Sequence, residues 1–241
     1  MTYVMSDLHG MYDRFIAMLE KIDFSDSDEL FIIGDIIDRG ERPVDILEYV
    51  MDKPNITVLL GNHEVMARDL LSRLTTEITE ENINSVDDDF LIELSIYKCN
   101  GGATTMKQLR ALPPVKRKEI IDFIDSLYAY EAIDIEDSTF VLVHAGLGNF
   151  RKDKKISEYA LYELLELRPD YERQYFDDDS VYIVSGHTPT KLISGKWEIY
   201  HSHNNIVIDC GALLAEGLRV SDLKIWLNSM CDSIIGIETA A

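Results

Sequence analysis

Five short motifs in this chain of 241 residues carry side chains of the kinds that bind metal ions and move protons. Aspartate carboxylates, asparagine carbonyl oxygens and imidazole nitrogens are ligands for divalent transition metals. The motifs are Asp7-Leu8-His9, Gly34-Asp35-Ile36-Ile37-Asp38-Arg39-Gly40, Gly61-Asn62-His63-Glu64, His144-Ala145-Gly146 and Gly186-His187-Thr188. No single motif has enough ligands to close a site, so the fold has to gather them. The sequence therefore predicts a metal-dependent hydrolase.

Six residues of these motifs are the candidate metal ligands. They are Asp7, His9, Asp35, Asn62, His144 and His187. Hard oxygens mixed with imidazole nitrogens suit Mn, Fe or Zn better than Ca or Mg alone. Asp35 stands among neutral neighbours, where a carboxylate can use both oxygens to bridge two ions. We expect two divalent or trivalent metal ions, with Mn first and Fe and Zn as the alternatives.

A centre of this kind suits the hydrolysis of phosphate esters. The anionic phosphorus centre repels an anionic nucleophile, and the alkoxide that leaves is a poor leaving group. Two metal ions held roughly 3.5 to 4 Å apart make hydroxide available near neutral pH and screen the charge of the phosphoryl oxygens.

Each motif follows a short apolar run that is typical of a buried strand. The predicted strands are residues 3–5, 30–33, 56–60, 140–143 and 181–184, with a sixth at 206–208. Residues 12–21 and 43–51 lie between the first three and have helical periodicity. Alternating strands and helices indicate βαβ units, whose ligands bind at the carboxyl ends of the strands.

The middle of the chain differs from this pattern. Residues from about 66 to 130 show helical periods interrupted by the turn signals Asn100-Gly101-Gly102 and Pro113-Pro114. We expect a helical insertion over the site within one domain that spans residues 1–241. Residues 200–205 are turn-like and predict a loop.

The composition excludes some partners. The chain has 44 acidic and 23 basic residues and a net charge of −21, which opposes nucleic acid and anionic membrane surfaces as partners. The cysteines Cys99, Cys210 and Cys231 are odd in number and lack metal-type spacing. No apolar run approaches the ~20 residues that cross a bilayer. The first apolar run begins at Tyr3 with no charged n-region and apolar h-region before it, so we expect no secretory leader. We expect a cytoplasmic protein with free thiols.

The order of the five motifs closely resembles the phosphoprotein phosphatase family of calcineurin-like metallophosphoesterases. This family includes protein serine/threonine phosphatases 1, 2A and 2B and compact bacterial and phage relatives. The resemblance extends from Tyr3 to about Gly211. It implies an α/β fold in which a central β-sandwich is flanked by helices, with a site for two metals at the strand ends.

The resemblance also implies a role for each motif. Asp7, His9 and a bridging Asp35 would hold one metal. The second metal would be held by Asp35, Asn62, His144 and His187. Asn62 is in addition a candidate contact for the substrate phosphate.

Four further residues acquire roles through the same resemblance. His63 would be free of metal and would protonate the departing oxygen, and Asp38 would steady it. An Asp partner raises the basicity of an imidazole and fixes its tautomer. Arg39 would bind the phosphoryl oxygens through its planar fork. Arg168 is the candidate for a second arginine, although Glu166 replaces an aromatic residue of the corresponding bacterial stretch.

These features favour a serine/threonine protein phosphatase that acts on phosphorylated proteins or peptides, or on small phosphoesters. The alternative enzyme is a symmetrical diadenosine tetraphosphate hydrolase or a related nucleotide pyrophosphohydrolase. Bacterial hydrolases of that kind commonly lack the aspartate before the arginine and have Asp after the Asn-His pair. Asp38 and Glu64 therefore favour the protein phosphatases. A non-catalytic scaffold would need none of these residues.

Overall fold

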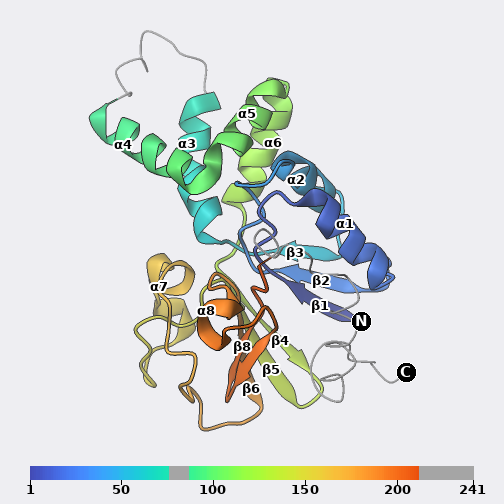
Figure 1. Cartoon of the computed structure of the whole chain (residues 1–241), viewed down its shortest axis with the longest axis vertical. Helices are drawn as coiled ribbons and strands as arrows, with labels where there is room; N and C mark the ends of the chain where they lie inside the picture. The colour runs from blue at the N-terminus through green and yellow to red at the C-terminus, as the bar shows by residue number, and fades with distance from the viewer. Residues whose placement is uncertain (76–86, 212–241) are drawn as a thin grey trace.

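The computed structural model describes residues 1–75 and 87–211. Two β-sheets lie at the centre, and helices cover their outer sides (Figure 1). This arrangement confirms the predicted α/β fold, with a helical insertion at the end of the first sheet.

The first sheet is parallel, with strand order β1-β2-β3. Its elements are β1 (Thr2–Met5), α1 (Tyr12–Lys21), β2 (Glu29–Ile32), α2 (Pro43–Met51) and β3 (Ile56–Val58). Helix α1 buries Phe15 and Leu19 on one face. Helix α2 begins at Pro43, whose fixed φ and missing N–H suit the first helical position. Both helices have the bounds predicted from periodicity, and the βαβ prediction is confirmed.

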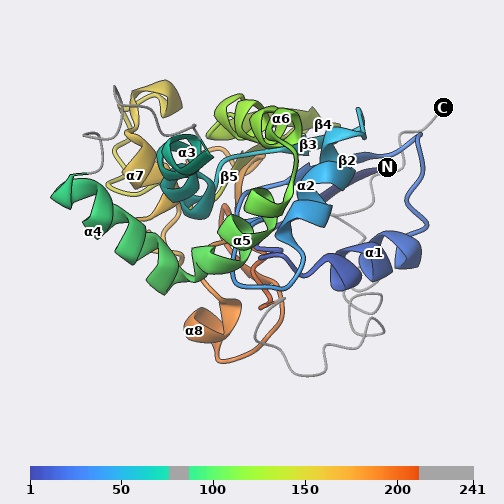
Figure 2. The ribbon, with the colours of Figure 1, turned by 90° about the horizontal axis from the view of Figure 1, so that it is seen from above.

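Residues 62–75 and 88–125 form the described part of the helical insertion. It comprises α3 (Asn62–Thr75), α4 (Asp88–Tyr97), a π-helical turn (Lys98–Gly102), α5 (Ala103–Ala111) and α6 (Pro114–Asp125). The side chain of Asp87 caps α4 by accepting from the backbone N–H of Phe90 at 2.9 Å. Figures 1 and 2 show these helices gathered next to α2, with α4 extending outward.

The second sheet has strand order β4-β5-β6-β8-β7. Its strands are β4 (Tyr130–Ile135), β5 (Ser138–Val143), β6 (Val181–Ser185), β7 (Tyr200–Ser202) and β8 (Asn205–Val207). The three inner strands are parallel, and both edge strands are antiparallel to their neighbours. A 3₁₀ turn (Ile156–Glu158) and the short helices α7 (Leu161–Leu165) and α8 (Thr190–Ser194) connect them.

Two strands were not predicted. The loop prediction for residues 200–205 is wrong at Tyr200–Ser202, which forms β7 and pairs with β8. His203 turns the chain between these strands with a φ of 52°. The edge strand β4 also lacked a prediction, because none of its residues is fully buried and it forms no continuous apolar run.

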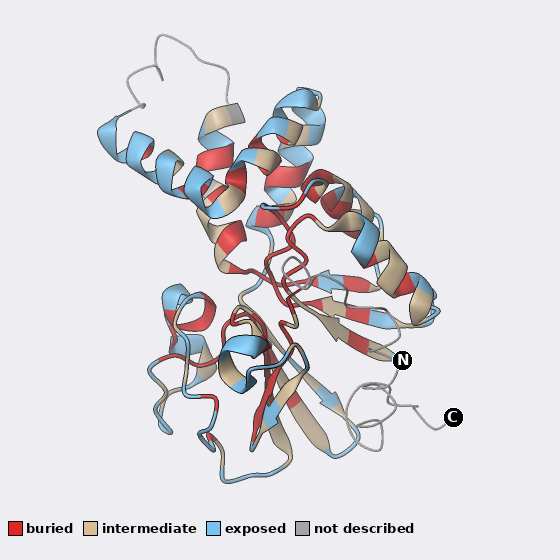
Figure 3. Cartoon of the chain, in the orientation of Figure 1, coloured by how far each residue is buried: buried red, intermediate tan, exposed pale blue. Residues whose placement is uncertain are grey.

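Apolar side chains from both sheets form a shared core. Its buried members are Ile33, Leu59, Phe140, Leu142, Val184, Ile206 and Ile208. Figure 3 shows the buried positions concentrated in the strands, the strand ends and the inner faces of the helices. This packing fixes the loops that follow the strands. Cys99 and Cys210 are free thiols, whereas Cys231 lies outside the described residues. Among the helices of residues 1–75 and 87–211, none is long and apolar enough to span a membrane.

Candidate active site

Four of the five motifs line a cavity of about 350 Å³ at the carboxyl ends of the parallel strands. His144 of the fifth motif is fully buried beside it, with its Nε2 3.5 Å from Asp35 Oδ1. The cavity is lined by Asp7, His9, Asp35, Arg39, Asn62, Arg168, His187, Pro189, Leu192, Asp209 and Gly211. Motifs that are up to 180 residues apart in the sequence are therefore neighbours here.

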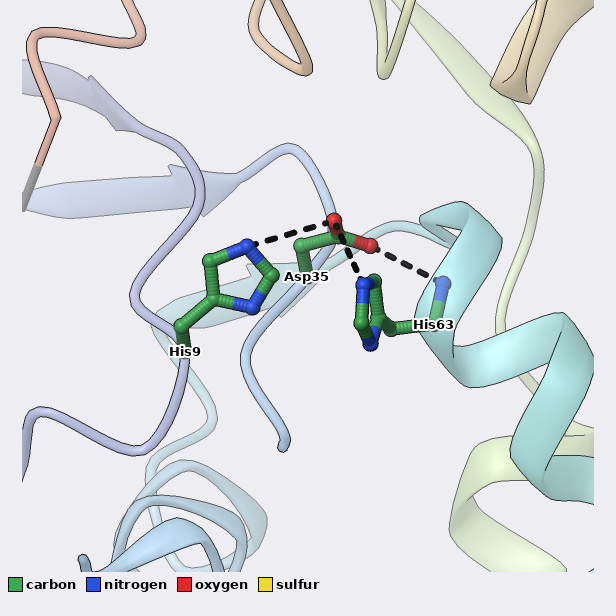
Figure 4. Close-up of side chains that lie close together, drawn as sticks. All are labelled: His9, Asp35 and His63. Atoms are coloured by element: carbon green, nitrogen blue, oxygen red, sulfur yellow. Dashed lines mark hydrogen bonds and ion pairs between the residues drawn. The ribbon is translucent and has the colours of Figure 1, made fainter. Parts of the chain in front are cut away.

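Asp35 lies at the centre of this cluster (Figure 4). Its Oδ2 is 3.6 Å from His9 Nε2 and 3.9 Å from His63 Nε2. Its Oδ1 is 3.5 Å from His144 Nε2. Asp35 thus belongs to two groups of possible metal ligands, His9-Asp35-His63 and Asp35-His144-His187. A carboxylate whose two oxygens face different histidines has the geometry needed to bridge two ions.

The imidazole rings are oriented by bonds to backbone carbonyls. His144 Nδ1 donates to the carbonyl of Ile33 at 2.9 Å, which leaves the Nε2 lone pair facing the site. That Nε2 lies 3.1 Å from Asn62 Oδ1, and His187 Nδ1 lies at the same distance from the same oxygen. In this tautomer His144 Nε2 and the amide oxygen are both acceptors. A cation bound between them would satisfy both, so the donor set fits a metal ion.

His9 and His187 are held in their neutral form. Burial, together with Arg39 and His63, lowers the pKa of His9 to about 2. Burial and the neighbouring His144 lower the pKa of His187 to about 3. A neutral imidazole is the form that binds a metal.

Asp7 lies to one side of these groups. Its Oδ2 accepts the backbone N–H of His187 at 2.9 Å, and it lines the cavity, but it is in neither group of three among the described residues. Burial and the nearby Asp209 raise the pKa of Asp7. Its assignment as a ligand stays a prediction.

His63 and Asp38 form a buried pair. His63 Nδ1 lies 2.7 Å from Asp38 Oδ2, and neither side chain is exposed to solvent. Burial by itself lowers the pKa of His63, but the hydrogen bond that its Nδ1–H donates to Asp38 and the charges of Asp35 and Asp38 outweigh it and raise the pKa. The pair therefore has the orientation expected of a proton donor and its partner.

Arg39 contacts both histidines of the first group. Its Nη1 lies 2.7 Å from His9 Nε2 and its Nη2 lies 2.9 Å from His63 Nε2. A guanidinium can only donate, so both nitrogens accept and both rings carry their proton on Nδ1. His9 Nδ1 accordingly faces the carbonyl of Ile37 at 3.2 Å. The lone pair that His9 offers to Arg39 is the one that it would offer to a metal.

Arg168 lies on the cavity wall on the side of the second sheet. Its Nε donates to Thr188 Oγ1 at 3.1 Å, and Tyr171 donates to the same oxygen at 2.7 Å. Thr188 belongs to the Gly-His-Thr motif, so this contact links Arg168 to the loop of His187. The structure thus brings both predicted arginines to the cavity.

The site loops have a strained backbone. Six candidate residues have positive φ angles, namely Asp7, His9, Asp35, Asp38, Arg39 and His187. Such conformations cost free energy and persist where surrounding contacts over-determine them. Glu64, which had no predicted role, supplies such contacts. Its carboxylate accepts the backbone N–H groups of Asp35, Ile36, Ile37 and Gly61.

Sequence comparison identifies the family. The sequence model described as calcineurin-like phosphoesterase matches residues 2–210. The chain belongs to this family and is a hydrolase of phosphoester bonds.

Two groups of relatives carry more specific names. An asymmetrical bis(5'-nucleosyl)-tetraphosphatase of Geobacillus sp. is 26% identical over 216 residues, which cover 78% of each chain. A symmetrical bis(5'-nucleosyl)-tetraphosphatase of Salmonella typhimurium is 41% identical over 66 residues, which cover 27% of this chain and 23% of that one.

Two solved structures share the fold. A putative diadenosine tetraphosphatase superposes with a TM-score of 0.55 at 14% identity, covering 86% of this chain and 82% of that one. A serine/threonine phosphatase of Saccharomyces cerevisiae superposes with a TM-score of 0.50 at 15% identity, covering 86% of this chain and 65% of that one. At these identities the likeness concerns the fold alone.

Proposed function

We propose that this chain is a metal-dependent phosphomonoesterase of the phosphoprotein phosphatase type, acting on phosphoserine and phosphothreonine in proteins or peptides. The buried pair of His63 and Asp38 is the observation that carries this proposal. A serine or threonine ester leaves as a strongly basic alkoxide, which needs a proton as it departs. The net charge of −21 opposes nucleic acid and anionic membrane surfaces as partners.

Asp35 would hold two metal ions together, with Asp7 and His9 on one side and Asn62, His144 and His187 on the other. When bound, such a pair makes hydroxide available near neutral pH and screens phosphoryl charge. Manganese is our first choice of metal, with iron and zinc as the alternatives.

The chain's own residues bind the substrate and move the proton. Arg39 and Arg168 line the same cavity, and their guanidinium groups suit the phosphoryl oxygens. The anion would draw Arg39 away from His63 Nε2. Because the pKa of His63 is raised, this nitrogen would then take up a proton from water and pass it to the leaving oxygen. Asp38 keeps the other ring nitrogen of His63 in place through its 2.7 Å contact.

The second candidate function is the hydrolysis of dinucleoside tetraphosphates, which the names of two relatives favour. When a phosphoanhydride is cleaved, the leaving group is a weakly basic phosphate, which has little need of a proton donor. A buried proton donor therefore favours the ester as substrate, whereas the relatives favour the anhydride.

A direct comparison under identical Mn²⁺ conditions tests the proposal. Phosphoserine and phosphothreonine peptides are assayed for released phosphate, and diadenosine tetraphosphate is assayed for nucleotide products. We expect higher kcat/KM for the peptides. Higher kcat/KM for the dinucleotide would overturn the protein phosphatase assignment. Two molecules of ADP would then indicate symmetrical cleavage, and ATP with AMP asymmetrical cleavage.

A further inference from the structure

The helical insertion contacts the catalytic pair from the side opposite His63. Asp38 is fully buried, and its Oδ1 accepts hydrogen bonds from Tyr97 Oη at 2.7 Å and from Thr105 Oγ1 at 2.6 Å. Its backbone N–H also donates to Thr105 Oγ1 at 3.0 Å. Tyr97 ends α4 and Thr105 lies in the first turn of α5, so two helices of the insertion bond one carboxylate.

These contacts fix the orientation of the Asp38 carboxylate. One oxygen is bonded to two hydroxyl groups and the other to His63, so rotation of the carboxylate would break buried hydrogen bonds. Burial and the neighbouring Asp38 raise the pKa of Tyr97, which keeps its phenol protonated and able to donate.

The π-helical turn between α4 and α5 contacts the loop that carries Asp38 and Arg39. The carbonyl of Gly101 accepts the backbone N–H of Arg39 at 3.1 Å, next to two residues with positive φ, Asp38 and Arg39. A Cβ at Gly101 would lie 2.7 Å from Arg39 Cγ, and one at Gly102 would overlap the ring of Tyr97. The two glycines therefore permit the close approach of the turn to the catalytic loop.

We propose that Tyr97 and Thr105 are positioning residues that, from the helical insertion, orient Asp38 and through it the proton-donating His63. This inference rests on the proposed role of His63. It assigns the insertion a part in catalysis, because its helices hold the pair that protonates the leaving group.

The test uses Tyr97→Phe, which removes one hydroxyl and keeps the ring. Turnover is measured on a phosphoserine peptide and on p-nitrophenyl phosphate, and bound Mn²⁺ is measured by elemental analysis. We expect a loss of about tenfold or more on the peptide, since a hydrogen bond to a charged group is removed. We expect less than about threefold on the nitrophenyl ester, whose leaving group departs without a proton. Metal content should not change.

Two comparisons separate positioning from simple stabilisation. Tyr175→Phe removes a buried hydroxyl that donates to the backbone of Asp170 at 3.0 Å, away from the site, and should affect both esters alike. Thr105→Val should reproduce the selective loss of Tyr97→Phe, and Thr105→Ser should recover it.

A double variant decides whether Tyr97 acts through His63. With His63→Asn already present, Tyr97→Phe should cause no further loss on the peptide. An added loss in the double variant, or an equal loss on both esters in Tyr97→Phe, would overturn the inference. If His63→Asn alone showed no preference between the esters, the proposed function would fail instead. If His63→Asn showed the expected selective loss on the peptide but Tyr97→Phe turned over both esters like wild type, the inference about Tyr97 would fail and the proposed function would stand.

Discussion

Replacing Asp35 by Asn should weaken both metal sites together. The two carboxylate oxygens of Asp35 lie 3.6 Å from His9 Nε2 and 3.5 Å from His144 Nε2, so each faces one group of ligands. An amide offers one good donor oxygen and no charge. A unit charge pair at roughly 4 Å is worth about 4 kcal/mol at an effective dielectric constant near 20. Losing this interaction in Asp35→Asn should raise the dissociation constant of each metal ion by about three orders of magnitude.

The assay is a Mn²⁺ titration of metal-stripped protein, with bound metal measured at each concentration. Asp134→Asn is the matched control, because it makes the same charge change on the exposed edge strand β4 and should leave both ions bound. Asp35→Asn protein that binds two full equivalents with wild-type affinity and has normal activity would refute the assignment of Asp35 as a bridge.

The remaining predictions concern the residues around Asp35. Arg39→Ala and Arg168→Ala should each weaken product inhibition by inorganic phosphate while metal content stays near normal; unchanged inhibition in Arg168→Ala would place the second phosphate contact elsewhere. Asp38→Asn should lower turnover on alkyl esters more than on nitrophenyl phosphate. Burial depresses the folded-state pKa of His9 to about 2, below its ordinary 6.5, so the unfolded chain takes up the proton first as the pH falls. His9→Gln should therefore remove up to about 2 kcal/mol of the stability that metal-stripped protein loses between pH 7 and pH 5, measured by denaturant titration.

The sequence predicted the elements that hold the site because each one has a strong periodic signal. Helices α1 and α2 begin and end where the apolar spacing indicated. The edge strands β4 and β7 were missed because an edge strand buries few residues, and their polar side chains resemble those of loops.

The types and spacing of the motif residues sufficed to predict a cluster around Asp35. The contacts that hold the cluster lie beyond such reasoning, because they join residues far apart in the chain. Tyr97 bonds Asp38 across 59 positions, and Thr105 does so across 67. A tyrosine and a threonine in a helical segment have no distinguishing pattern in one sequence. The four backbone bonds to Glu64 likewise depend on the course of the chain.

The measurement that tests the central claim most directly is the turnover of His63→Asn on two esters, with metal content determined in the same preparation. We predict that both ions are retained and that turnover on a phosphoserine peptide falls by about 10² to 10⁴, the usual effect of losing a general acid. The loss on p-nitrophenyl phosphate should be much smaller. A protein that loses one metal, or that is equally impaired on both esters, would contradict the account and show that His63 serves the metal site.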